Sequence, residues 1–306
     1  MNGYVETSAP ASANEKHNQA QIAMKTHPSV NVTTITDTAP ATRHNEAMTH
    51  AEPKPLPREH GAWGLLLQPY FAGAILAREW NWLLLPALGL VLFGFLLRET
   101  LIVLARQRFV WRDYNPQSAG AARWLIAEAL GAALCLAILI AQRPLAALAA
   151  LTGVAALLTL LAVWLTIKNK QRSIWLQLLS AAGLGTTALL AILTSTGAIP
   201  AWAWPLWAVL TLHGASSILT VHTRLALKRV PGGKPPLTAY ATPALSIAVA
   251  FVAPAPLLFS AAANIWERLR LRHPGTLQEP LKRVGLRALA VSITHSLLAV
   301  AAFWNR

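Results

Sequence analysis

The chain has 306 residues, of which 55% are hydrophobic and only 12% are charged. Soluble domains carry about 25% charged residues, so this composition argues against an ordinary water-soluble protein. A net charge of +14 would suggest nucleic-acid binding in a soluble protein, but here the basic residues lie between apolar runs. Membrane topology explains basic residues in such places, so we expect no nucleic-acid partner.

The first 57 residues form a polar segment rich in Ala, Thr, Asn, Pro and His, without a long apolar run. Such a composition cannot bury enough apolar surface to offset the entropy lost on folding. We therefore predict a disordered cytoplasmic tail over residues 1–57 and a transmembrane helical domain over residues 58–306.

Nine apolar segments follow the tail, and most approach the roughly 17–25 residues that a helix needs to cross a bilayer. They cover residues 61–77, 82–97, 124–141, 145–167, 174–193, 202–221, 237–252, 254–266 and 288–304. The seventh and eighth are short, and only Ala253 separates them. They could instead form one long broken helix or a re-entrant pair.

The basic residues indicate how these segments are oriented. If the N-terminus is inside, twenty Lys and Arg residues fall in inside segments near the predicted spans, and only Arg78, Arg143 and Arg306 fall outside; the other three lie in the distal tail. Cytoplasmic loops are enriched in Lys and Arg, so this split favours nine spans with the N-terminus inside and the C-terminus outside. Merging the seventh and eighth spans would move a loop with six basic residues outside, which argues for two separate crossings.

Ionisable side chains inside a bilayer are costly and therefore mark candidate functional positions. His213 lies near the middle of the sixth span, His295 near the middle of the ninth, and Glu128 one turn inside the third. Each is a candidate for proton transfer or ligand contact, and the alternative is a hydrogen bond between helices. The single cysteine and the spacing of the histidines predict neither a metal site nor a cofactor.

Two of the predicted spans carry a polar face. Residues three or four positions apart share one side of a helix. The two faces consist of His213, Ser217, Thr220 and Arg224 in the sixth span and Ser173, Gln177, Ser180 and Thr187 in the fifth. Both lead toward the predicted cytoplasmic edge, so they predict either a cavity open to the cytoplasm or polar contacts between helices.

The sequence Pro-Arg-Glu-His-Gly-Ala-Trp at residues 57–63 resembles the opening signature of the YwiC-like family of bacterial membrane proteins. The continuation through Pro69 and Gly73 fits that signature, and Arg172-Ser173 and residues 217–225 are looser matches. Thr220 and His222 replace an aromatic and a basic residue of the family's pattern. The resemblance covers about residues 57–304 and implies a multi-pass protein of the bacterial inner membrane, but it supplies no activity.

Nine helices with this orientation are also similar to the architecture of the UbiA prenyltransferases. Those enzymes place aspartate-rich motifs after helices two and six, where Mg²⁺ joins the carboxylates to a diphosphate. Here only Glu99 and Asp113 follow the second span, and no acid lies between the sixth span and Pro236. Mg²⁺ prefers oxygen ligands, so standard prenyl transfer is not expected, and the lack of a complete catalytic motif weighs against an enzyme.

We therefore predict a membrane protein that binds an anionic lipid, or an isoprenoid or quinone-like ligand, in a cavity facing the cytoplasm. The candidate ligand-binding residues share the predicted cytoplasmic edge and are expected to converge: Glu59, His60, Arg98, Arg172, Ser173 and Arg224. One alternative is a UbiA-type transferase that lacks the aspartate motifs. The other is a proton-coupled transporter of a small solute that uses His213, His295 and Glu128.

Overall fold

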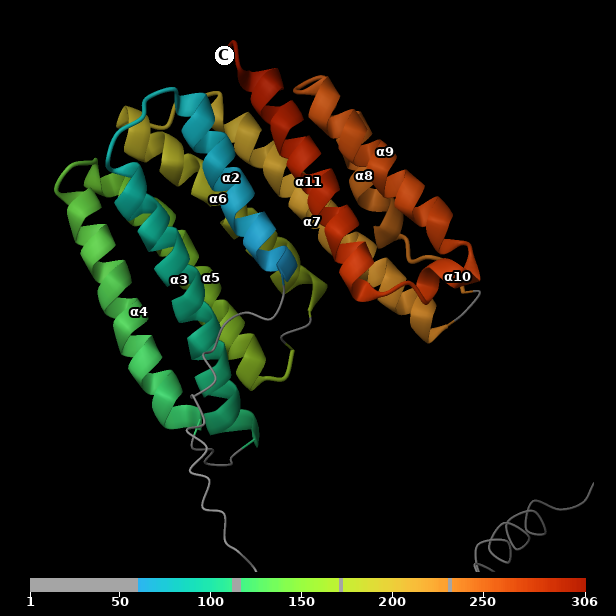
Figure 1. The fold of residues 1–306 in the computed structure, drawn as a ribbon, viewed down its shortest axis with the longest axis horizontal. Coiled ribbons are helices and arrows are strands. Elements are labelled where there is room, and N and C mark those ends of the chain that lie inside the picture. Colours follow the sequence, from blue (N-terminus) through green and yellow to red (C-terminus); the bar gives the residue numbers. More distant parts are fainter. Residues whose placement is uncertain (1–59, 112–116, 171–172, 231–232) are drawn as a thin grey trace, which may run out of the picture. The chain divides into compact units, whose positions relative to one another are not determined.

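The computed structural model describes residues 60–111, 117–170, 173–230 and 233–306, and the secondary-structure elements in these ranges are all helical. The helices of Figure 1 are α2 (His60–Ala77), α3 (Leu84–Ala105), the π-helical turn η1 (Arg106–Trp111), α4 (Gln117–Ile140), α5 (Leu145–Ile167), α6 (Ile174–Thr196), α7 (Ala203–Arg229), α8 (Thr238–Ala248), α9 (Pro254–Leu271), α10 (Pro274–Leu277) and α11 (Leu281–Phe303). The predicted disordered tail lies outside the described residues.

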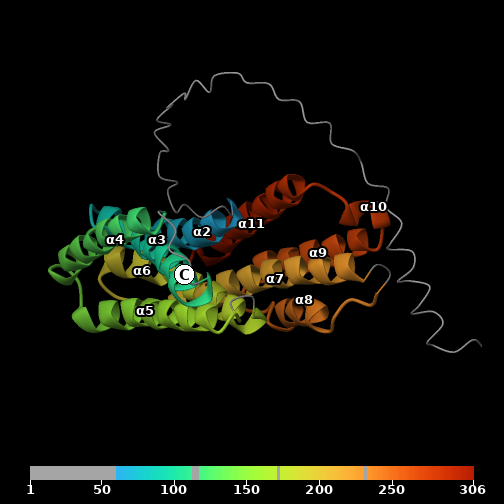
Figure 2. The ribbon, with the colours of Figure 1, turned by 90° about the horizontal axis from the view of Figure 1, so that it is seen from below.

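The helices form two groups with α2 and α6 between them. In the first group α3 packs against α4 and α5, and in the second α7 packs against α8, α9 and α11. Helix α2 packs closely on α6 and also contacts α11, so it joins the two groups (Figures 1 and 2).

Small residues allow α2 and α6 to approach each other closely. A β-carbon added at Gly73 would lie 2.4 Å from the carbonyl oxygen of Ala188, which only a glycine can avoid. Nearer the start of α2, Thr187 Oγ1 of α6 donates a hydrogen bond of 3.2 Å to the Leu66 carbonyl. Tyr70 on the same helix donates to the Leu84 carbonyl of α3 at 2.5 Å, so α2 is fixed to both neighbours.

Six helices in the described part of the chain are long and apolar enough to cross a membrane. They lie within Leu84–Val110, Gly120–Ile140, Leu145–Ile167, Ile174–Thr196, Ala203–Arg229 and Lys282–Phe303. The apolar part of α2, Trp63–Ala77, is shorter. Large apolar side chains on α4 and α5 face outward, and Leu130, Leu134, Leu157 and Leu160 are each at least 65% exposed. Water would disfavour such a surface, whereas acyl chains would cover it.

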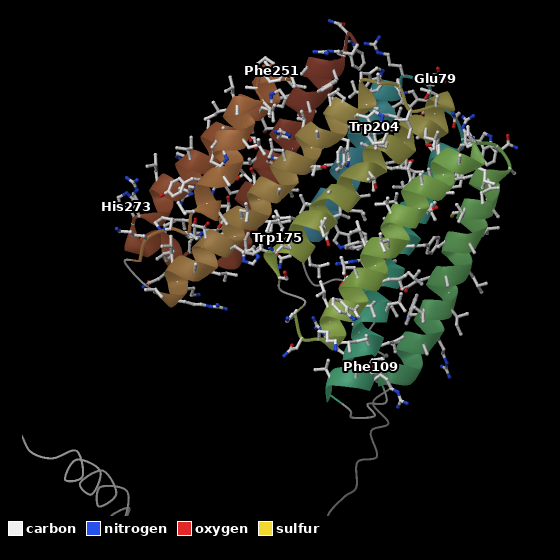
Figure 3. The ribbon with its side chains drawn as sticks, turned by 180° about the vertical axis from the view of Figure 1, so that it is seen from behind. Glu79, Phe109, Trp175, Trp204, Phe251 and His273 are labelled. Atoms are coloured by element: carbon white, nitrogen blue, oxygen red, sulfur yellow. The ribbon has the colours of Figure 1, made fainter. Side chains whose placement is uncertain are left out.

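Exposed aromatic residues lie at the helix ends, as expected for the two interfaces of a bilayer. Trp204, Phe251 and the neighbouring charged Glu79 lie at one end of the helices in Figure 3, and Phe109 lies at the opposite end. Trp204 is 51% exposed and Phe251 84% exposed.

Each of the nine predicted apolar segments overlaps a helix, and several of these helices extend beyond the predicted segment. The helix of the second span continues through Ala105 into η1, that of the sixth continues to Arg229, and that of the eighth continues to Leu271. Arg98 and Arg224 therefore lie within these helices, beyond the predicted apolar segments. Arg, Lys and Leu favour helix, and long basic side chains can extend from a helix end toward lipid headgroups.

The seventh and eighth predicted segments are two distinct helices. Helices α8 and α9 pack against each other and are joined by residues 249–253, so the alternative of one long broken helix is wrong. Helix α8 has 11 residues. It therefore rises about 16 Å, roughly half the hydrocarbon thickness of a bilayer.

The segments that were predicted to lie outside gather at one end of the helices. Arg143 donates from Nη2 to the Thr194 carbonyl at 2.6 Å, and Arg78 donates to the carbonyl of Trp304. Arg306 reaches the turn between α8 and α9. The α9–α11 connection, which Arg224 contacts, lies at the opposite end of these helices (Figure 1).

Candidate functional site

The structure describes only part of the predicted ligand-binding set. Glu59 and Arg172 lie outside the described residues, and the side chain of His60 is not described. Arg98 forms an ion pair with the adjacent Glu99 on α3. Ser173 precedes α6 without capping it, and Arg224 lies on α7. Because α2 and α6 lie between α3 and α7, Arg98 and Arg224 belong to different groups of helices (Figure 1).

Arg224 is engaged by the segment that connects α9 to α11. Its Nη2 donates to the carbonyls of Thr276, at 2.7 Å, and Glu279, at 3.2 Å. Its Nη1 lies 3.8 Å from Glu267 Oε1. This arginine therefore joins the end of α7 to the α9–α11 connection, a structural role that accounts for most of its donors.

Arg224 belongs to a cluster that we call the edge network, which consists of Arg224, Glu267, Arg270, Glu279 and Arg287. Arg287 binds both carboxylates of the network, Glu267 at 3.0 and 3.2 Å and Glu279 at 3.0 Å through two nitrogens. The hydrogen bonds from Arg287 lower the pKa of Glu279 to about 2, and the nearby charges of Arg270 and Arg224 act in the same direction. The two carboxylates of the edge network thus form ion pairs with its three arginines.

Arg268 is a buried cation outside the edge network. The residue is only 8% exposed, and among the described residues none of its three guanidinium nitrogens has a hydrogen-bond partner. The guanidinium carbon lies 5.0 Å from the centre of the Tyr240 ring on α8, and Tyr240 itself is 48% exposed. Arg268 is one of the six basic residues of the last predicted inside loop, and it was not predicted as a site. Its spacing of four from Asn264 and of eight from Ser260 could have placed it on the buried face of α9.

The predicted intramembrane histidines meet each other. His213 of α7 and His295 of α11 stack with ring centres 4.1 Å apart and an angle of 11° between the rings. His213 is hydrogen-bonded through Nδ1 to Ser260 Oγ and through Nε2 to Ser292 Oγ, each at 3.0 Å. Both histidines are buried, so α7, α9 and α11 share one polar centre inside an otherwise apolar region.

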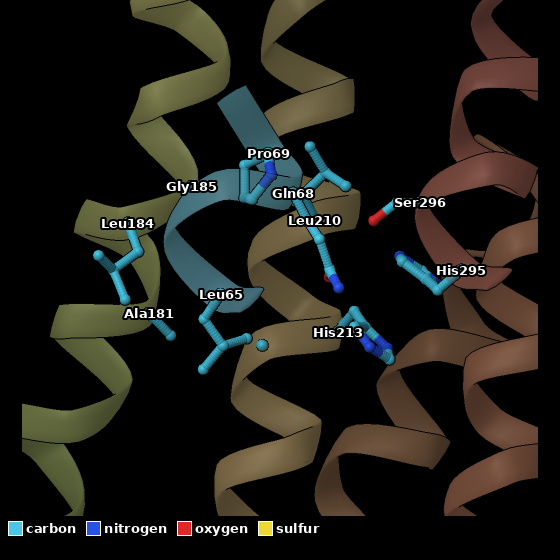
Figure 4. Close-up of a pocket in the computed structure, with 11 residues that line it drawn as sticks. Leu65, Gln68, Pro69, Ala181, Leu184, Gly185, Leu210, His213, His295 and Ser296 are labelled. Carbon is cyan, nitrogen blue, oxygen red and sulfur yellow. The ribbon is translucent and has the colours of Figure 1, made fainter. Parts of the chain in front are cut away.

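The second histidine borders a small cavity. His295 Nδ1 is bonded to the Pro256 carbonyl at 3.0 Å, and its buried Nε2 has no hydrogen-bond partner of good geometry, although the Val209 carbonyl lies close enough to act on the ring. A cavity of about 20 Å³ lies beside both rings. Figure 4 shows the Gln68 side chain of α2 extending toward the two imidazoles, and the Gln68 amide nitrogen is also buried without a partner.

The polar faces of α6 and α7 make contacts between helices. His222 Nε2 lies 2.8 Å from Gln177 Oε1 across α6 and α7. Thr220 of α7 instead faces α9, where its hydroxyl donates to Asn264 Oδ1 at 2.7 Å. The sequence predicted either an open cavity or polar contacts between helices, and at these positions the polar side chains form hydrogen bonds between helices.

Glu128 of α4 lies apart from the histidines, in the other group of helices. It is only 4% exposed and faces Thr100 of α3, with no hydrogen bond of good geometry between the two side chains. Within the described ranges no group of three or more His, Cys, Asp and Glu side chains is arranged to hold a metal ion.

Long apolar helices, an outward apolar surface and polar groups gathered at the helix ends and in the interior define a multi-pass helical membrane protein. A family model described as YwiC-like protein matches residues 56–192, so the resemblance predicted from the sequence is confirmed over that part of the chain. No curated protein and no solved structure matches the chain. The matched range covers α2 to α5 and most of α6, whereas His213, Arg268 and His295 lie beyond it.

Proposed function

We propose that this protein crosses the bacterial inner membrane several times, with its N-terminus inside, and binds an anionic lipid at its cytoplasmic edge through Arg268. The observation that carries the proposal is the buried guanidinium of Arg268, whose three nitrogens are all without a hydrogen-bond partner. The orientation rests on the twenty-to-three division of basic residues and on the grouping of Arg78, Arg143 and Arg306 at the end opposite Arg224.

An unpaired buried cation needs a counterion. Leaving one member of a buried ion pair without its partner costs about 3–5 kcal/mol. Glu267 of α9 and Glu279 of the α9–α11 connection are already bound by Arg287. No described carboxylate forms an ion pair with Arg268, so a phosphate group from outside the chain is the fitting partner. Guanidinium groups bind phosphate oxygens through paired hydrogen bonds.

The surroundings favour a phosphate that belongs to a lipid. Tyr240, Leu237 and Leu269 are 48%, 89% and 47% exposed, which offers apolar surface to acyl chains beside the cation. Exposed Arg272 and Arg283 add positive charge at the same edge, where anionic lipids concentrate against basic segments. A headgroup phosphate at Arg268 with its chains along α8 and α9 would satisfy both surfaces.

An isoprenoid diphosphate offers the same phosphate chemistry and remains within this proposal. A quinone-like head carries no formal charge, so Arg268 gives it less support. Transferase activity of the UbiA type gains no support, because the described carboxylates near this edge are bound by arginines and do not form a metal-binding group. Transport is the remaining alternative, and it depends on a different feature, the histidine pair.

The test is native mass spectrometry of the full chain released from nanodiscs that contain either phosphatidylglycerol or only phosphatidylcholine. The variant is Arg268→Gln, and the matched control is Arg272→Gln, which removes an exposed arginine four residues further along. We expect phosphatidylglycerol adducts on the parent and on Arg272→Gln, and at least a tenfold loss on Arg268→Gln.

Two results would contradict the proposal. One is equal retention of phosphatidylglycerol by Arg268→Gln and the parent. The other is full displacement of the lipid by millimolar inorganic phosphate, which would assign the site to a free anion. Melting temperatures measured for the three proteins in neutral lipid check that the Arg268 variant is folded.

A further inference from the structure

A second polar site lies in the interior of the helical domain, and unlike the basic edge around Arg268 it contains histidine and amide side chains. The cavity of about 20 Å³ beside the histidine pair is bordered by Gln68 of α2, Gly185 of α6, His213 and Gly214 of α7, and His295 of α11. A cavity needs roughly 10–15 Å³ of such volume to hold a water molecule. The space therefore fits one water and excludes a larger solute.

The hydrogen-bond partners fix which atoms of this cavity donate and which accept. A carbonyl can only accept, so His295 must carry its proton on Nδ1 to bond the Pro256 carbonyl. In the neutral ring Nε2 is then an acceptor, and it is buried without a good partner. The Gln68 amide nitrogen is a buried donor, also without a partner. A single water molecule, which both donates and accepts, matches these two groups.

We propose that this cavity is a proton-transfer site, in which one water molecule between Gln68 and His295 passes a proton to His295 Nε2. When a hydronium ion occupies the cavity, one of its O–H bonds breaks and an N–H bond forms at Nε2. Neutral water remains in the cavity, and His295 becomes an imidazolium. The reverse step returns the proton, so no oxidant or second reactant is needed.

The stacking of the two rings links this proton to the helices. An imidazolium at His295 lies 4.1 Å from the His213 ring, which two serine hydroxyls from α9 and α11 already hold. His213 is the other titratable side chain that borders the cavity among the described residues, and α2 and α6 contribute only uncharged groups there. Two adjacent charges would repel each other, so the pair takes up one proton at a time.

A glycine offers a way to remove the water without disturbing the fold. A β-carbon added at Gly214 would lie 3.5 Å from Ala181 Cβ and 3.6 Å from Leu65 Cδ2, which are ordinary contacts. Because those two residues also border the cavity, Gly214→Ala fills part of it. The matched control is Gly94→Ala on α3, where an added β-carbon meets nothing within 4 Å.

The experiment uses the full chain in liposomes with ¹⁵N-labelled histidine. Nuclear magnetic resonance reports magnetisation transfer from water to the His295 ring, and an entrapped pH dye reports proton uptake driven by a potassium diffusion potential. For the parent and Gly94→Ala we expect both the water contact and proton uptake well above that of empty liposomes. For Gly214→Ala and His295→Gln we expect no water contact and at least a tenfold slower uptake.

Persistence of the water contact or of the uptake in Gly214→Ala would overturn the proposal, and so would the absence of either signal from the parent. The melting temperature of Gly214→Ala should equal or exceed that of the parent, since alanine is favoured over glycine in a helix. A large decrease would assign the loss of uptake to misfolding, and Gln68→Met, which removes the amide that the proposal places against the water, then serves as the second variant. Unchanged uptake and an unchanged water contact in that variant would count against the site.

Discussion

Replacing Gly73 with alanine should destabilise the protein by forcing α2 away from α6. The added β-carbon would lie 2.4 Å from the Ala188 carbonyl oxygen and 2.8 Å from its Cα, and both are backbone atoms that cannot rotate away. Restoring an ordinary contact of 3.4 Å requires the helices to separate locally by about 1 Å. A gap of that size forfeits roughly a quarter to a half of the dispersion energy at each neighbouring contact.

The expected cost of this overpacking is about 1–3 kcal/mol. For a domain of this size that corresponds to a melting temperature lower by about 2–12 °C. The single cysteine of the chain, Cys135, provides the assay, because its sulfur packs over Gly89 of α3 and becomes available to a fluorogenic maleimide on unfolding. Gly94→Ala, with open space around the new methyl group, should melt at or slightly above the parent temperature.

The reasoning fails if Gly73→Ala melts together with Gly94→Ala. That result would mean that α2 and α6 do not approach as closely as the contact at Ala188 requires. It would also remove the support for the cavity at the histidine pair, since Leu65 and Gln68 of α2 reach that cavity only because α2 is close to α6 and α7.

Two further predictions concern the ends of the helices. The pKa of Glu279 is held at about 2 by Arg287, so the stability from this pair is complete above the ordinary carboxyl value of 4.5. That stability should be lost as the pH falls from about 4.5 toward 2, and Glu279→Gln should abolish this part of the pH dependence of the melting temperature. Arg143→Ala leaves the Thr194 carbonyl without two of its donors, and we expect a loss of about 1–3 kcal/mol in thermal unfolding, whereas Arg123→Ala, at an exposed position, should have little effect.

The positions of the helices could be predicted because a membrane imposes one strong requirement on the sequence. A segment that crosses lipid must satisfy its own backbone and remain apolar over many residues, and both properties can be read locally. The cytoplasmic ends could not be predicted in this way. Three polar residues follow both Leu97 and Val221, so hydropathy ends the predicted span there. The apolar and basic residues beyond them nevertheless continue the helix through Ala105 and Arg229.

Arg224 and Arg268 show that the sequence pattern does not reveal which basic side chains have hydrogen-bond partners in the folded protein. Charge counting identified Arg224 and Arg268 equally well as residues of one edge. Which of the two has partners depends on how α9 is rotated toward α7 and on where the α9–α11 connection brings Thr276 and Glu279. The Thr276 and Glu279 carbonyls and the Glu267 carboxylate bind the guanidinium group of Arg224. The guanidinium group of Arg268 instead lies over the ring of Tyr240. The prediction of an anion site at this edge therefore keeps its chemistry but moves from one arginine to another.

The histidines show the opposite case, in which the residues were predicted and their relation was not. His213 and His295 stood out because ionisable groups are rare in a bilayer, but they are 82 positions apart, and nothing local indicates that α7 and α11 touch. Stacking gives the pair a property that neither residue has alone, since protonation of one ring opposes protonation of the other. The cavity also needs Gln68 from α2, so a helix of the family-matched range and two helices beyond it complete the same site.

The two proposed sites share α9 as a structural element, which allows them to be coupled. Ser260 holds His213, Asn264 one turn later donates to the Ser260 carbonyl at 2.7 Å, and Arg268 follows after one more turn. A shift of α9 that followed protonation of the pair would therefore move Arg268 relative to Tyr240 on α8. Linkage requires the effect to be reciprocal, so a lipid bound at Arg268 would change the affinity of His295 for its proton by the same factor. If phosphatidylglycerol leaves the titration of His295 unchanged, the two sites act independently, and α9 serves only to hold each in place.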